Sequence, residues 1–157
     1  MIWQLPNGKF FDDQGVTPSD LPSGTVEYTG PWPIPPTLAE QQTAQIALLQ
    51  SAFEQAEQAP ISLTLASGIT TSFGMTPHDR TKIVGLYAKY VAKGDAVPSG
   101  YSLPDANMVL RVVTATDIDN LFEAGKTQMT GAIAKLASLV AQVQSATTVS
   151  AVQAIVY

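Results

Sequence analysis

The sequence ISLTLASGITTSF at residues 61–73 decides the fold of the C-terminal part of the chain. Apolar residues alternate with Ser and Thr on both sides of a Gly-containing turn, which is typical of two half-buried antiparallel strands. A two-residue loop would place the apolar residues of the two strands on opposite faces, whereas a three-residue loop pairs Ile61 with Phe73 on one face. We therefore predict the three-residue loop, with Gly68 at a positive φ.

A helix signal precedes this hairpin. Thr37 and Glu40 form a capping box, in which each residue's side chain can bond to the other's backbone amide. The helix that starts there is expected to run to about Ala59, because Pro60 follows. Its apolar stripe is narrow, so we expect a helix that protrudes and pairs with another helix.

Further helices and a strand follow the hairpin. The sequence predicts a helix over Thr76–Gly94, a long helix from about Ala115, and a short terminal helix that starts at Thr147 or Thr148. Met108–Val113 is rich in β-branched residues and predicts a strand. We expect that strand to join the hairpin as its third member.

The first 36 residues differ in composition from the rest of the chain. Apolar residues on either side of a Pro-Asn-Gly turn at residues 6–8 predict a small hairpin. The Pro-rich segment Gly30–Pro36 predicts a stiff, polyproline-like linker. Five aromatic residues lie in this short region: Trp3, Phe10, Phe11, Tyr28 and Trp32.

The expected fold class is α+β. A small three-stranded antiparallel sheet is packed by helices, and an aromatic β-hairpin region and a protruding helix precede it. The predicted domain organisation is a β-region and linker at 1–36, a connecting helix at 37–59 and an α+β domain at 60–157.

Composition argues against several classes of protein. Charged residues make up only 13% of the chain, the formal net charge is −5, and the Lys and Arg residues do not cluster. Nucleic acid and anionic membranes are therefore poor partners. Neither a signal peptide nor an apolar stretch long enough to cross a membrane is expected.

Residues suited to catalysis are sparse as well. There is no Cys, and the single His, His78, falls in the first turn of a predicted helix, where a cation is disfavoured. No phosphate-binding glycine pattern occurs. We expect no catalytic residue, no bound cofactor and no metal ion, and hence a protein that is not an enzyme.

Two segments resemble a known family. Residues 68–80, GITTSFGMTPHDR, and residues 146–152, ATTVSAV, resemble a domain of unknown function that is common near the C-termini of tailed-phage tail proteins. The resemblance covers about Ala59 to Tyr157. It implies a bacteriophage tail protein that acts as a tail-fibre assembly factor, or chaperone, or as a bound accessory subunit of the virion.

The residues expected to contact partners lie near both ends of the chain. No charged residue follows Lys135, and we expect the apolar C-terminal segment to be too large for so small a core to cover. The predicted partner-binding residues are Trp3, Phe10, Phe11, Tyr28, Trp32, Val152, Ile155 and Tyr157.

The expected function is therefore non-enzymatic protein binding. The partner is a phage tail or tail-fibre protein, with homo-oligomerisation as a second option. The expected location is the host cytoplasm during assembly, with the virion tail as the alternative. A carbohydrate-binding role at the tail tip, through the N-terminal aromatics, is the alternative function.

Overall fold

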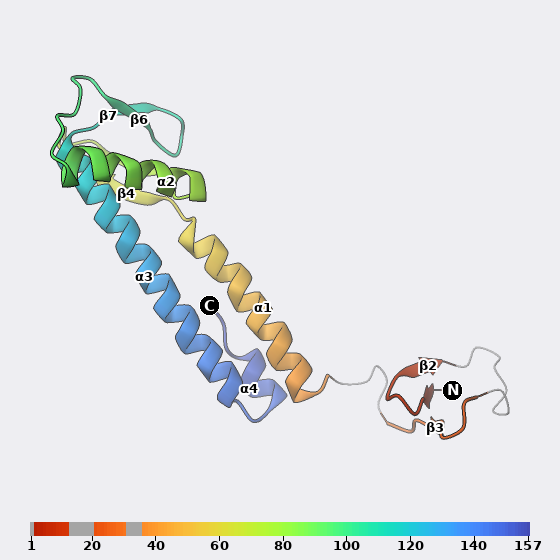
Figure 1. Ribbon diagram of the computed structural model, residues 1–157. Coiled ribbons are helices and arrows are strands. Elements are labelled where there is room, and N and C mark those ends of the chain that lie inside the picture. Colours follow the sequence, from red (N-terminus) through yellow and green to blue (C-terminus); the bar gives the residue numbers. More distant parts are fainter. Residues whose placement is uncertain (1, 13–20, 31–35) are drawn as a thin grey trace. The chain divides into compact units, whose positions relative to one another are not determined.

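The computed structural model describes residues 2–12, 21–30 and 36–157 (Figure 1). The chain divides into two compact units, Met1–Thr37 and Leu38–Tyr157. The helix predicted at 37–59 belongs to the second unit, so it is not a separate connecting segment.

The first unit contains a three-stranded antiparallel sheet. Its strands are β1 (Ile2–Gln4), β2 (Phe10–Asp12) and β3 (Val26–Glu27), in the order β2-β1-β3. Strands β1 and β2 form a hairpin around a turn in which Gly8 has a φ of 78°. Strand β3 was not predicted. Most of the expected linker lies outside the described residues.

The second unit is built from helices and two hairpins, which establishes the α+β class. Its elements, in chain order, are α1 (Leu38–Glu57), β4 (Ile61–Thr64), β5 (Thr70–Phe73), α2 (Pro77–Leu86), the π-helical turn η2 (Tyr87–Ala92), β6 (Ser102–Pro104), β7 (Leu110–Val112), α3 (Ala115–Ser145) and α4 (Val149–Gln153).

The β4–β5 hairpin has the predicted register. Ile61 pairs with Phe73 across the two strands, and the backbone amide of Leu65 donates to the carbonyl of Ile69 at 2.9 Å. Gly68 closes the three-residue loop with a φ of 83°. The prediction is confirmed, because only this loop length keeps the apolar residues of both strands on one face.

The predicted three-stranded sheet in the second unit is wrong. Strand β7 pairs with β6, and each hairpin is its own two-stranded antiparallel sheet. Only the amide of Ala106, which donates to the carbonyl of Ser72 at 2.7 Å, links the two hairpins through backbone hydrogen bonds. Strand β6 was missed because it is short and contains Pro104, and it lies much closer in the chain to β7 than β5 does.

The expectation that the helix at 37–59 protrudes is also wrong. Figure 1 shows α1 beside α3, with which it is in contact. Leu49 of α1 is 1% exposed and packs with Val143 and Val152, which are wholly buried. The narrow apolar stripe of α1 is thus covered by the chain's own C-terminal helices.

Two apolar clusters form the core of the second unit. The first joins the β4–β5 hairpin, α2 and the N-terminal part of α3, with Phe73, Met75 and Ile118 among its buried residues. The second joins α1, α4 and the C-terminal part of α3 around Leu49. Helix α3 therefore runs through both clusters.

Candidate functional site

An apolar groove lies between α2 and α3. Its volume is about 620 Å³. Side chains from α2, from α3 and from the segment before α2 line it, and they include Met75, Val84, Phe122, Met129 and Ile133. Val84 and Ile133 are each 52% exposed, so the groove opens to solvent between two apolar side chains.

A glycine makes room for the floor of this groove. A Cβ atom on Gly125 of α3 would lie 2.6 Å from the Cε atom of Met75. Any larger residue would therefore push Met75 away from the helix. Met75 and Met129 give the groove a deformable lining, since methionine side chains adapt readily to the shape of a neighbour.

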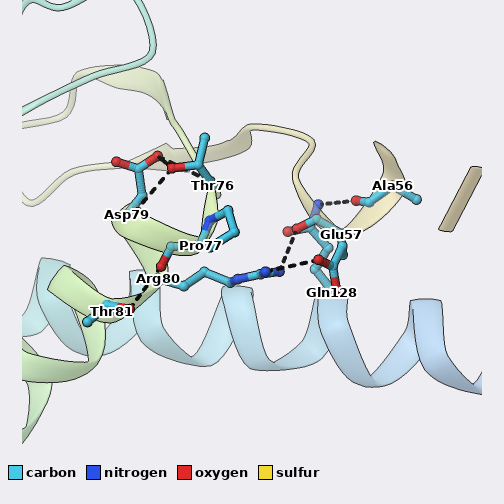
Figure 2. Close-up of polar contacts among 8 residues, drawn as sticks. All are labelled: Ala56, Glu57, Thr76, Pro77, Asp79, Arg80, Thr81 and Gln128. Atoms are coloured by element: carbon cyan, nitrogen blue, oxygen red, sulfur yellow. Dashed lines mark hydrogen bonds and ion pairs between the residues drawn. The ribbon is translucent and has the colours of Figure 1, made fainter. Parts of the chain in front are cut away.

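The charged residues at the groove are already paired within the chain. The Arg80 guanidinium bonds to the Glu57 carboxylate at 3.0 Å and to the Glu57 carbonyl at 3.2 Å (Figure 2). Lys126 lies 3.1 Å from Glu123 on the same helix. A partner that covers the groove would therefore leave no charge buried without its counter-charge.

The same polar contacts fix the geometry of the groove. Thr76 and Asp79 form the capping box that starts α2, and Pro77 occupies the first helical turn (Figure 2). The Gln128 amide of α3 donates to the carbonyls of Ala56 and Ala59, at 3.0 and 2.9 Å. Together with the Arg80–Glu57 ion pair, these bonds tie the end of α1 to α2 and to α3, the two walls of the groove.

The β6–β7 hairpin is held by a buried carboxylate. The side chain of Asp105 is 0% exposed and accepts four hydrogen bonds. The donors are the Thr71 hydroxyl at 2.8 Å, the Arg111 Nε at 2.9 Å, and the amides of Asn107 and Val109, both at 2.9 Å. Burial by itself would raise the pKa of Asp105, but these hydrogen bonds outweigh it and lower the pKa to about 2.

This hairpin exposes a strip of apolar side chains. We call Met108, Val109, Leu110 and Val112 the hairpin strip; their exposed fractions are 79%, 45%, 70% and 58%. Clustered exposed apolar residues on a folded chain mark an interaction site more often than scattered ones do. The sequence contains a signal for the strip. Three consecutive apolar residues, 108–110, precede Arg111, and Val112 follows it.

The aromatics predicted to bind partners are partly packed within the first unit. Trp3, Phe10 and Tyr28 are half-buried, and the rings of Phe10 and Tyr28 meet edge to face at 4.9 Å. Phe11 lies in β2, but its side chain is not described, and Trp32 lies outside the described residues. Packing within the first unit thus explains the presence of Phe10 and Tyr28 without a partner.

Of the C-terminal residues predicted to contact a partner, Val152 is covered by the chain itself, and Ile155 and Tyr157 are half-buried. Val152 is wholly buried against Leu49 of α1, which corrects the expectation that another chain must cover it. The carbonyl of Ile155 accepts a hydrogen bond from Gln45 at 2.6 Å, and the ring of Tyr157 lies 4.4 Å from the Lys135 Nζ. The sequence argument failed because it left α1 out of the core.

Asp117 and His78 lie at the starts of two different helices. Asp117 caps α3 through Thr114, and His78 is exposed in the first turn of α2. Within the described residues, no group of three or more His, Cys, Asp or Glu side chains could hold a metal ion. No described helix is both long enough and apolar enough to cross a membrane.

Comparison with protein families gives a match over most of the chain. Residues 40–156 match a family described as "Domain of unknown function (DUF4376)". No curated protein and no solved structure matches the chain. The matched range contains the groove, the hairpin strip and all but the first two residues of α1.

Proposed function

This chain belongs to the DUF4376 family, and we propose that it is a non-enzymatic, protein-binding component of a bacteriophage tail. It acts as a tail-fibre assembly factor or as a bound accessory subunit. The assignment to a phage tail rests on the resemblance of residues 68–80 and 146–152 to tail proteins. The assignment to protein binding rests on the surface of the second unit.

The hairpin strip is the observation that carries the protein-binding role. Four apolar side chains are exposed together on a hairpin that Asp105 anchors to β5 through Thr71. A partner that covers them gains apolar burial without first having to order the hairpin. The groove between α2 and α3 offers a second apolar surface.

Mass spectrometry of purified particles distinguishes the two forms of this function. A bound accessory subunit is found in a fixed ratio to the major tail protein. An assembly factor is absent from the particle, but deletion of its gene lowers the yield of complete tails. If the protein is absent from particles and its deletion leaves tail assembly unchanged, the proposed function is wrong.

A carbohydrate-binding role is the second candidate. Trp3 and Phe10 are only half-buried, and aromatic faces can stack on sugar rings. A glycan array with the wild type and a Trp32→Ala variant tests it. Binding that the substitution abolishes supports receptor recognition, whereas an array with no binding by the wild type removes this candidate.

A further inference from the structure

Three hairpins in this chain share one type of turn. In each, the residue before the loop donates its amide to the residue after the loop and accepts a hydrogen bond from the third loop residue. The paired bonds measure 2.8 and 2.9 Å at Leu5, 2.9 and 2.8 Å at Leu65, and 2.9 and 2.9 Å at Asp105. The third loop residue has a positive φ in all three turns.

One of these turns places a large residue where the others have glycine. Gly8 and Gly68 have φ values of 78° and 83°, and Met108 has a φ of 63°. Met108 is the only non-glycine residue with a positive φ in the described part of the chain. Because this conformation is unfavourable for a residue with a Cβ atom, glycine would suit the turn better.

The Met108 side chain does not stabilise its own unit by burial. It is 79% exposed, more than any other large apolar side chain in the described part of the chain. The turn therefore keeps an unfavourable residue whose apolar side chain points outward from the core. Strain of this kind is typical of positions that meet a ligand or a partner.

We propose that the hairpin strip of one copy of this chain inserts into the α2–α3 groove of a second copy, and that the two copies exchange hairpins reciprocally. This inference rests on the proposed protein-binding function and names the partner of the same surfaces. Met108 acts as the anchor of the strip, and the groove around Met75 and Met129 receives it.

The charges of the two surfaces are compatible with this contact. The loop and strand residues 106–110 carry no charge, and the two charged side chains on either side of them, Asp105 and Arg111, are paired with each other. The cations of the groove, Arg80 and Lys126, are paired with acids of their own chain. Each surface thus meets a neutral partner, although the whole chain has a net charge of −5.

The area of the strip favours a reciprocal exchange over a single insertion. A Val, Leu or Met side chain carries about 100 Å² of apolar surface, so four side chains exposed by 45–79% offer about 250 Å². One insertion would bury this area and a comparable area of the groove and its rim, about 500 Å² in total, which is the size of a crystal contact. Two reciprocal insertions bury about 1,000 Å², the lower limit of a specific interface. A closed dimer is therefore expected.

Sedimentation equilibrium of the full chain gives the first test. We expect the wild type to form dimers in a concentration-dependent manner. Met108→Gly should weaken dimerisation about tenfold or more, since it removes the anchor, while the melting temperature of the monomer stays equal or rises. Ile133→Glu at the rim of the groove should weaken dimerisation in the same way. A wild type that is monomeric at all concentrations overturns the proposal.

Disulfide trapping gives the second test, and the absence of cysteine from the chain makes it simple. A tagged chain with Met108→Cys is mixed with a chain that carries Met129→Cys, under mild oxidation. We expect the mixed dimer to form several-fold faster than with a Leu48→Cys chain. Leu48 is the matched control, because it is 63% exposed on α1 and does not line the groove.

The two tests separate this inference from the proposed function. Equal trapping by Met129→Cys and Leu48→Cys, or a dimer linked mainly through Met108→Cys to itself, overturns the hairpin exchange. Either result leaves the presence of the protein in purified tails, or its effect on tail yield, to decide the proposed function separately.

Discussion

The two ends of α3 are joined to the rest of the second unit by different chemistry. At its N-terminal end, buried carboxylates hold the two hairpins. At its C-terminal end, aliphatic side chains and neutral amides hold α1 and α4. One helix thus organises two cores, and buried carboxylates bond to the surrounding segments only at its N-terminal end among the described residues.

At the N-terminal end, Asp117 bonds in two directions. One carboxylate oxygen accepts from the amide and hydroxyl of Thr114, at 2.8 and 2.7 Å, and so caps α3. The other accepts from the amide of Ala66 in the β4–β5 loop at 2.7 Å. Asp105 fixes the β6–β7 hairpin in the same manner.

At the C-terminal end, two glutamines of α1 take the place of the aspartates. The Gln42 amide donates to the carbonyls of Val143 and Ala146, at 3.0 and 3.2 Å, where α3 ends. Gln45, which is 7% exposed, donates to the carbonyl of Ile155 after α4. These amides satisfy carbonyls that a helix end leaves without partners.

The largest expected effect comes from a charge in the C-terminal cluster. Val152→Glu should lower the free energy of unfolding by about 4 kcal/mol or more, because Val152 is wholly buried and the cluster offers no partner charge. Urea denaturation measures the change. Val156→Glu is the matched control, since Val156 is 71% exposed, and it should cost less than about 0.5 kcal/mol. Equal losses in the two variants would contradict the packing of α4 against α1.

The next largest effect is expected at the N-terminal end. Asp117→Ala removes a helix cap and the charged acceptor of the Ala66 amide, which together should cost about 2–3 kcal/mol. Urea denaturation measures this as well. Asp119→Ala, two residues along α3, removes neither the cap nor the bond to Ala66 and should have a much smaller effect. A comparable loss in both variants would indicate that Asp117 contributes only as a surface charge.

A smaller effect is expected for the bonds that Gln42 and Gln45 donate to the C-terminal segment, which we call the glutamine clamp. Gln45→Ala leaves the carbonyl of Ile155 without its donor and should cost about 1–2 kcal/mol. Gln50→Ala, at an exposed position on the same helix, should be nearly neutral. Amide hydrogen exchange of α4 locates the change: faster exchange confined to α4 and the end of α3 supports the clamp, and unchanged exchange there contradicts it.

The smallest expected difference between the two ends of α3 is their response to acid. The pKa of Asp105 is about 2 in the folded chain, below its ordinary value of 3.8, so its carboxylate contributes stability above pH 3.8 that is lost as the pH falls toward 2. The effect is partial, because the group is only half protonated at its own pKa. The amide resonances of Asn107 and Val109 should shift over this range, while those of Val143 and Ile155 should not follow the same titration. The shift should be absent in Asp105→Asn.

Local signals in the sequence predict several elements of this fold. The alternation at residues 61–73 and the position of Gly68 predict the loop length and register of β4–β5, because a shift by one residue would expose the apolar face. Thr76 and Pro77 predict the start of α2, and Thr148 is one of the two predicted starts of α4. These predictions succeed because the interactions involved join residues only a few positions apart.

Local signals are a poorer guide to the surfaces proposed to bind partners. The sequence placed contacts at Val152 and at the aromatics of the first 36 residues, whereas the groove needs α2, α3 and Gly125 to be placed together. The hairpin strip could have been suspected from the apolar residues around Leu110, but its exposure depends on β7 pairing with β6 rather than with β5.

The sequence by itself therefore determined the periodic helices, their caps and the turn of one hairpin. The tertiary structure alone decided which apolar surfaces cover one another. An apolar stripe has the same pattern whether its own chain or another chain buries it, as Val152 illustrates. The choice depends on the packing of segments far apart in sequence, here α1 against α4, and hydrophobic burial is non-directional.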